Sequence, residues 1–133
     1  MQKDDLVFVG HMPDLARKAL ELSQQKTRED FDSDEALALA LTHLLQVIGE
    51  AARKTSKSFT DRHPEIPWKA IIGMRHKVVH DYLYVDRDLV WEVTKRDLEP
   101  LVASLTSSFL NDHRPTALLL PVPFVSLNLL TGV

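Results

Sequence analysis

The sequence contains no cysteine, which excludes disulfide bonds and thiolate metal sites in this chain of 133 residues. Only four glycines are present and β-branched residues rarely cluster, so the composition favours helices over strands. No segment has the pattern of a signal peptide. The longest apolar run, Ala117 to Val125, is too short to span a bilayer and is interrupted by two prolines. We therefore expect a single domain that functions in the cytoplasm and has no membrane partner.

The chain also has little net charge, −3 at neutral pH, which argues against general coating of nucleic acid. The charge is unevenly distributed, because residues 51–80 hold seven lysines and arginines against two acids, a net +5, and the rest of the chain carries −8. A basic segment on an acidic body can bind a phosphate backbone locally while limiting indiscriminate binding. Solvated helix faces and a loop would give the same distribution, so charge alone leaves both interpretations open.

The first part of the chain is expected to form a helix over residues 4–25, followed by a polar connection over 24–32. A glycine and Pro13 weaken the start of this helix, so its secure part is expected to begin near Pro13. At the end of the connection, Asp32 followed by Glu35 has the form of a capping box, with Asp in place of the usual Ser or Thr.

A second helix is expected over 34–56, because apolar residues recur there on one face. The residues of this face are Leu37, Leu41, Leu44, Leu45, Ile48 and Ala52. Leu39, Ala40 and Val47 lie outside the face, which is typical of a central helix or of a subunit interface. The polar link over 56–63 is expected to contain at most one helical turn.

A last helix is expected after Asp86, whose side chain can accept hydrogen bonds from the N–H groups of the first turn. Its apolar pattern continues to Leu110, but Pro100 lies inside it and predicts a kink or break near Arg96 or Asp97. The chain is thus expected to form an all-α bundle of four to five helices with short connections.

Between these helices, residues 64–84 combine an apolar helical pattern with unusually many polar side chains. Pro67 suits the first turn of a helix. The apolar positions that follow are Trp68, Ile71, Ile72, Met74, Val78, Val79 and Leu83. The polar residues set among them are Arg75, His76, His80 and Tyr82. Buried cations and imidazoles are costly unless they are paired, so this concentration of polar residues indicates a functional site.

Arg75, His80 and Tyr82 form the pattern Arg-x-x-x-x-His-x-Tyr, with the polar His76 directly after the arginine. This pattern resembles the signature of HEPN domains, and specifically that of the HepT-like ribonuclease toxins. Three further stretches match the same family in the same order: Gly-Glu-Ala-Ala at 49–52, Pro-Glu-Ile-Pro-Trp at 64–68, and Val-Asp followed by Val-Trp between 85 and 91. The resemblance covers roughly residues 4–110.

The resemblance implies a HEPN-type helical domain over residues 1–110, in a homodimer whose motif helices meet at the interface. Residues 111–133 would then be an atypical C-terminal tail. Helix geometry gives a separate reason for the dimer. On one straight helix, Arg75 and His80 lie roughly 140° apart around the axis and about 7.5 Å along it, so one phosphate would not easily touch both. Two protomers that share a cleft would remove this difficulty.

RNA can be cleaved without a metal or other cofactor if three groups cooperate. A base takes the proton of the ribose 2′-OH, a cation stabilises the charged phosphorane, and an acid protonates the leaving 5′-oxygen. We assign the proton transfer to His80 and the phosphate clamp to Arg75. His76, or the partner subunit's His80, would supply the remaining proton transfer. The products would be a 2′,3′-cyclic phosphate and a 5′-hydroxyl.

Two carboxylates are candidate partners of Arg75. Glu50 or Asp81 could orient the guanidinium for catalysis, or form an ion pair that is only structural. His76 and His80 have the i, i+4 spacing of two metal ligands, but no third ligand stands out, so no metal is expected.

Tyr82 follows His80 by two residues, so its hydroxyl could reach the cleft and contact RNA. The corresponding tyrosine of the HepT-like toxins is modified with AMP by an MNT-type nucleotidyltransferase antitoxin. AMP on Tyr82 would place bulk and negative charge beside Arg75. A core aromatic residue with its hydroxyl at the surface would fit the same position, and Tyr84 is an alternative acceptor.

Two functions from different classes follow. The first is a metal-independent ribonuclease toxin with an RNA substrate and a nucleotidyltransferase antitoxin as its partner. The second is a non-catalytic helical module that binds and orients a nucleotidyltransferase. The complete pair of Arg75 and His80 favours the nuclease, because a scaffold needs neither side chain.

Overall fold

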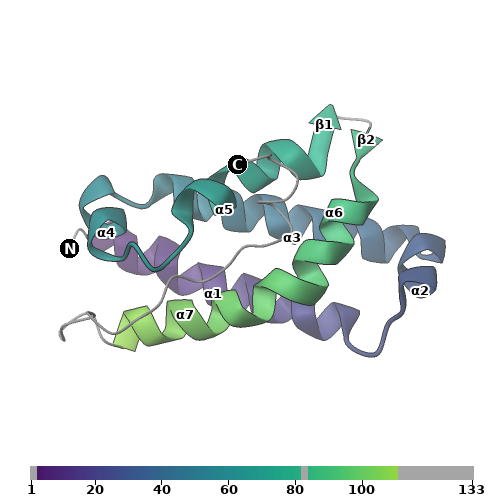
Figure 1. The fold of residues 1–133 in the computed structure, drawn as a ribbon, viewed down its shortest axis with the longest axis horizontal. Coiled ribbons are helices and arrows are strands. Elements are labelled where there is room, and N and C mark those ends of the chain that lie inside the picture. Colours follow the sequence, from purple (N-terminus) through teal and green to yellow (C-terminus); the bar gives the residue numbers. More distant parts are fainter. Residues whose placement is uncertain (1–2, 82–83, 111–133) are drawn as a thin grey trace.

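Helices make up nearly all of the fold in the computed structural model, which describes residues 3–81 and 84–110. The long helices are α1 (Lys3–Ser23), α3 (Glu35–Lys54), α5 (Trp68–Val78) and α7 (Leu98–Leu110). The short elements are α2 (Arg28–Ser33), α4 (Lys57–Arg62), β1 (Val79–Asp81), β2 (Tyr84–Val85), α6 (Arg87–Glu92) and a π-helical turn, η1 (Val93–Asp97). Successive long helices run in opposite directions, with α2 and α4 at opposite ends (Figure 1). The predicted all-α bundle is confirmed.

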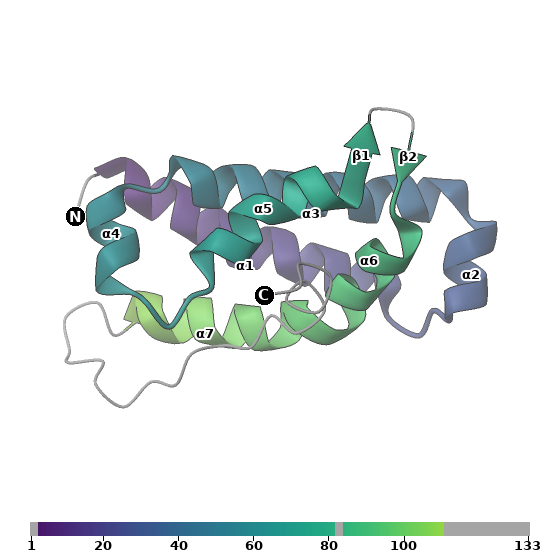
Figure 2. The same cartoon turned by 45° about the horizontal axis from the view of Figure 1, so that its top comes forward.

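The helix α3 is the centre of the bundle, packed against α1 and α5 (Figure 2). All residues of its predicted apolar face are buried, and burial of each leucine contributes roughly 1.5–3 kcal/mol. Leu39 lies on the opposite side and is 57% exposed. By length and composition alone α3 could cross a membrane, but the buried central helix of a bundle has the same properties.

The helix α1 begins at Lys3 and continues through Pro13, so the expectation that it is secure only from Pro13 is wrong. Tertiary contacts hold its first turns. The buried Asp5 carboxylate accepts hydrogen bonds from the Ser56 backbone N–H, at 2.8 Å, and from the Ser56 hydroxyl, at 2.6 Å. Val9 is buried in the core. These interactions outweigh the one backbone hydrogen bond that a proline removes.

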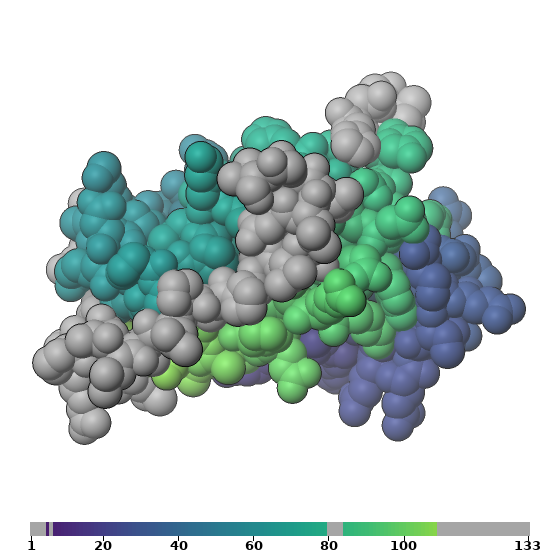
Figure 3. Space-filling model, in the orientation of Figure 1, coloured from purple at the N-terminus to yellow at the C-terminus, as the bar shows by residue number. Residues whose placement is uncertain are grey.

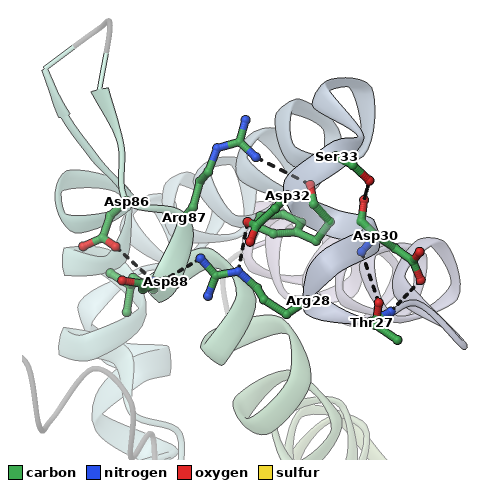
Figure 4. Close-up of polar contacts among 10 residues, drawn as sticks. Thr27, Arg28, Asp30, Asp32, Ser33, Asp86, Arg87 and Asp88 are labelled. Atoms are coloured by element: carbon green, nitrogen blue, oxygen red, sulfur yellow. Dashed lines mark hydrogen bonds and ion pairs between the residues drawn. The ribbon is translucent and has the colours of Figure 1, made fainter.

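The expected polar connection contains the short helix α2, and the predicted capping box at Asp32 and Glu35 is wrong. A capping box forms earlier, where Thr27 accepts from the Asp30 N–H and the Asp30 carboxylate accepts from the Thr27 N–H (Figure 4). Asp34, the residue before Glu35, caps α3 by accepting from the Leu37 N–H at 3.1 Å.

The motif helix α5 begins at Trp68, directly after Pro67 as expected, but it ends at Val78, whereas the expected apolar pattern continues to Leu83. The chain then enters β1, where Val79 lies opposite Val85 of β2, and the Asp86 N–H donates to the Val78 carbonyl at 2.7 Å. Adjacent β-branched valines favour this extended backbone. The backbone of His80 is therefore in a strand. The expected helical relationship between Arg75 and His80, and the dimer argument that used it, do not apply.

The last helical segment begins where predicted and becomes π-helical next to the predicted kink or break. Asp86 caps α6 by accepting from the Leu89 N–H at 3.0 Å. The π-helical turn η1 ends at Asp97, next to the predicted break. Pro100 has no N–H to donate to the carbonyl four residues earlier, which removes one bond of the regular α-helical ladder at this point. The predicted tail, 111–133, lies outside the described residues.

Candidate functional site

Gly49 allows α3 and α5 to approach closely next to the motif arginine. A Cβ atom at position 49 would lie 3.0 Å from the Ile71 carbonyl oxygen and 3.5 Å from the Arg75 Cβ. A side chain there would push the two helices apart. The glycine of the Gly-Glu-Ala stretch therefore places the next residue, Glu50, beside Arg75.

Glu50 is the centre of a cluster of basic side chains. Arg75 donates from Nη1 to Glu50 Oε2. Arg53 binds both carboxylate oxygens, with Nε 3.1 Å from Oε2 and Nη2 2.6 Å from Oε1. The Lys54 Nζ lies 3.9 Å from Oε1. Glu50, one of the two candidate partners of Arg75, is thus paired with it.

The charges in this cluster favour an anion. The hydrogen bonds from Arg53 are the main cause that lowers the pKa of Glu50 to about 2; burial raises this pKa, and the charges of Arg53, Arg75 and Lys54 lower it further. Glu50 is therefore ionised at neutral pH. Among the described side chains, one carboxylate faces three cations, so this part of the site carries a net charge of +2 and is open to solvent, as a phosphate site requires.

The other predicted site residues follow Arg75 along the chain. His76 is exposed on the last turn of α5. His80 and Asp81 belong to β1, which projects with β2 from one edge of the bundle (Figures 1 and 2). The side chains of His80 and Asp81, and the whole of Tyr82, lie outside the described residues. The site is thus built where the end of α5 and the start of the hairpin meet α3.

The Pro-Glu-Ile-Pro-Trp stretch anchors the start of α5 to α7. The buried Glu65 carboxylate accepts from the Ser108 hydroxyl at 2.6 Å, and the same oxygen lies 3.2 Å from the His63 Nδ1. Trp68 donates from Nε1 to the His63 carbonyl at 2.9 Å. This buried network fixes the position of the helix that carries Arg75.

A second feature near the hairpin is a pocket of about 500 Å³, which is lined by β2 and by the first turns of α3 and α6. In the space-filling view, α2 forms the end of the molecule and α6 begins beside it (Figure 3). Arg28 at the pocket is held by Asp32 and Asp88, at 3.0 and 2.7 Å (Figure 4). The lining holds two arginines and three acids, so the pocket does not attract a phosphate electrostatically.

Within residues 3–81 and 84–110, no three His, Asp or Glu side chains are grouped so that they could hold a metal ion. Sequence reasoning missed Arg53, which makes more hydrogen bonds to Glu50 than Arg75 does. The signal was present, because an acid and a base three residues apart on a helix are neighbours.

Comparisons with known proteins identify the family of this chain. Residues 12–107 match the family model described as "Ribonuclease HepT-like". A protein from Thermococcus cleftensis named "Probable ribonuclease HepT" is 37% identical over 95 residues, which are 68% of this chain and 86% of the relative. A protein named "Putative RNase" from Caldanaerobacter subterraneus is 38% identical over 73 residues, 55% of this chain and 65% of that relative. A comparison with solved structures gave no match. The chain belongs to the HepT-like ribonuclease family.

Proposed function

We propose that this protein is a metal-independent ribonuclease that cleaves RNA by attack of a ribose 2′-OH on the adjacent phosphate. The observation that carries the proposal is the placement of Arg75, which is held by Glu50 inside a cluster of net positive charge on the family's own motif. A guanidinium oriented in this way matches the oxygens of a phosphorane.

In the proposed reaction, an imidazole removes the 2′-OH proton and the 2′-oxygen forms a bond to phosphorus. The P–O5′ bond breaks, and a second imidazole protonates the leaving 5′-oxygen. His80 supplies one of these groups. The partner subunit's His80, or the exposed His76, supplies the other. Arg75 stabilises the negative charge that builds on the phosphorane oxygens, and the products carry 2′,3′-cyclic phosphate and 5′-hydroxyl ends.

The active form is a homodimer with a composite site. The support within the chain is an apolar surface on α3, where Ala36 and Leu39 are exposed and Ala40 and Val47 are half-buried, on the same side as Glu50. These four apolar positions lie outside the buried face of α3 and would be covered in a dimer. A second subunit there would bring its own hairpin and motif helix to the same cleft.

Mixing two inactive variants tests the composite site. If Arg75 and His80 act from different subunits and His76 supplies the second imidazole, an equal mixture of Arg75→Ala and His80→Ala protomers restores about a quarter of the wild-type activity, since half of the dimers then hold one intact site. No recovery in a mixture shown to contain heterodimers would contradict this arrangement and would favour a site that needs both His80 side chains.

The proposed cellular role is a toxin, neutralised in the cytoplasm by a nucleotidyltransferase antitoxin that adds AMP to Tyr82. AMP adds bulk and negative charge next to a site that binds phosphate. Co-expression with such a transferase, followed by mass spectrometry of the peptide over 75–87, tests the modification. An unmodified Tyr82 in fully neutralised protein would contradict it, and AMP on Tyr84 would move the site by two residues.

The direct test of the ribonuclease is cleavage of an RNA pool by the purified chain and by His80→Ala. The variant should lose activity by about 10²–10⁴-fold, the usual contribution of a general acid or base, and should relieve growth arrest while the dimer persists. A wild-type chain that arrests no growth and cleaves no RNA would instead favour a non-catalytic module that orients a nucleotidyltransferase.

A further inference from the structure

Glu50 accepts hydrogen bonds from two arginines, but in different numbers. Arg53, one turn away on α3, places its Nε and Nη2 on the two carboxylate oxygens, at 3.1 and 2.6 Å. Arg75, which comes from α5, donates only from Nη1 to Oε2. The planar fork of Arg53 therefore occupies the carboxylate from one side, and Arg75 approaches the remaining edge of one oxygen.

This arrangement decides how much charge Arg75 can offer to a phosphate. A single carboxylate neutralises a single guanidinium. With Arg53 in place, the charge of Glu50 is balanced within α3, and Arg75 is oriented without being neutralised. Without Arg53, the Glu50 carboxylate would pair with Arg75 alone. It would then neutralise the Arg75 guanidinium and compete with the phosphate for its N–H groups. Glu50 would not relieve this competition by protonation at neutral pH, because even the ordinary pKa of its carboxyl, 4.5, lies well below 7.

We propose that Arg53 is a positioning residue for RNA, which acts by neutralising Glu50 so that Arg75 keeps its charge for the phosphate. The inference rests on the proposed ribonuclease function and adds to it a residue outside the Arg-x-x-x-x-His-x-Tyr pattern. Arg53 acts through Glu50 and need not touch RNA. Its effect on RNA binding therefore depends on the charge of Glu50, which distinguishes it from a residue that contacts phosphate directly.

A double-mutant cycle tests this dependence. The full chain, Arg53→Ala, Glu50→Gln and the double variant are titrated with a labelled random-sequence oligonucleotide of 2′-O-methyl RNA, which binds but has no 2′-OH to attack. Arg53→Ala should weaken binding about tenfold and lower the log–log salt slope by about 0.9, the value of one phosphate contact. In the Glu50→Gln background the same substitution should change the affinity less than about twofold.

Two further variants complete the experiment. Arg53→Lys keeps the charge without the fork and should recover most of the affinity that Arg53→Ala loses. Lys57→Ala removes one cation from the same basic part of the chain, but its partner is the exposed Asp61, at 2.7 Å. This control should bind RNA within about twofold of the wild type. Circular dichroism of each variant excludes loss of fold as the cause.

The inference is overturned if Arg53→Ala weakens binding equally in both backgrounds, because Arg53 would then contact phosphate itself. It is also overturned if Arg53→Ala leaves the affinity for RNA unchanged in the chain that keeps Glu50. The same four proteins can also be titrated with inorganic phosphate while the NMR signal of the Arg75 Nε–H is followed. This measures the affinity of the arginine for phosphate without RNA. The Arg53 inference is therefore decided separately from the proposed ribonuclease, which fails if the wild type cleaves no RNA.

Discussion

Arg75 donates a hydrogen bond to Glu50 and so joins the motif helix α5 to the central helix α3. The arginine's position is set by the same contact that joins the two helices, so the site and the core of the bundle are coupled. Changes at this contact should affect RNA cleavage and stability to different degrees, which allows the two roles to be separated.

Replacement of the Arg75 guanidinium should remove most of the catalytic activity. Arg75→Ala is expected to lower the single-turnover rate of RNA cleavage by about 10²–10³-fold, the usual effect of losing one preorganised donor to a developing anion. Arg75→Lys should restore little, since an ammonium has no fork for two phosphate oxygens. Cleavage at the wild-type rate by a folded Arg75→Ala dimer would exclude the proposed clamp.

Gly49 and Gly73 form a matched pair for testing the close approach of the helices. Gly49→Ala should lower the free energy of unfolding by about 1–3 kcal/mol, because its Cβ would lie 3.0 Å from the Ile71 carbonyl oxygen. A Cβ at Gly73 meets nothing within 4 Å, so Gly73→Ala should raise that free energy by roughly 0.5–1 kcal/mol. Urea unfolding measures both. Equal effects of the same sign would show that helix contact does not require Gly49.

The lowered pKa of Glu50 predicts a pH dependence of stability. The folded value, about 2, lies below the ordinary value of 4.5. The stabilisation by this carboxylate is therefore complete above about pH 4.5 and is lost as the pH falls toward 2. The difference in urea midpoint between the wild type and Glu50→Gln should shrink over this window and stay constant between about pH 6 and 8. A difference in urea midpoint that does not change with pH down to about 3 would contradict the lowered pKa of Glu50.

The buried network at the start of α5 predicts that Ser108 contributes to stability. Ser108→Ala removes the hydroxyl that donates to Glu65 at 2.6 Å, and the loss of this donor to a buried carboxylate should cost about 1–3 kcal/mol. Its half-buried neighbour Ser107 is the control. Ser107→Ala should change the free energy of unfolding by no more than about 0.5 kcal/mol. Thermal and urea unfolding of both variants measure the difference.

The sequence predicted the elements whose residues carry their own signals. The buried apolar face of α3 and the Asp86 cap are local patterns, and both are confirmed. The irregularity expected near Arg96 or Asp97 is a π-helical turn that ends at Asp97. The ion pair of Arg75 with Glu50 was one of two considered and is present, whereas the side chain of Asp81, the other candidate, lies outside the described residues.

Three predictions were wrong because tertiary contacts or alternative local structures determine the fold at those positions. Apolar spacing continued through Val79, but adjacent valines can pair as a strand, and the hydrogen bond from Asp86 to Val78 ends the helix there. The start of α1 depends on Asp5 reaching Ser56, a contact between residues 51 positions apart that periodicity does not reveal. Asp32 does not cap α3, because it lies inside α2, where its carboxylate pairs with Arg28, and Asp34 takes the cap position.

The most direct test of the proposed ribonuclease compares two otherwise identical oligonucleotides, one with ribose and one with 2′-deoxyribose at the cleavage site. The account predicts cleavage of the first alone, with 2′,3′-cyclic phosphate and 5′-hydroxyl ends, in buffer that contains a metal chelator. Cleavage of the deoxy-substituted strand at the same rate, or products with 5′-phosphate ends, would contradict it.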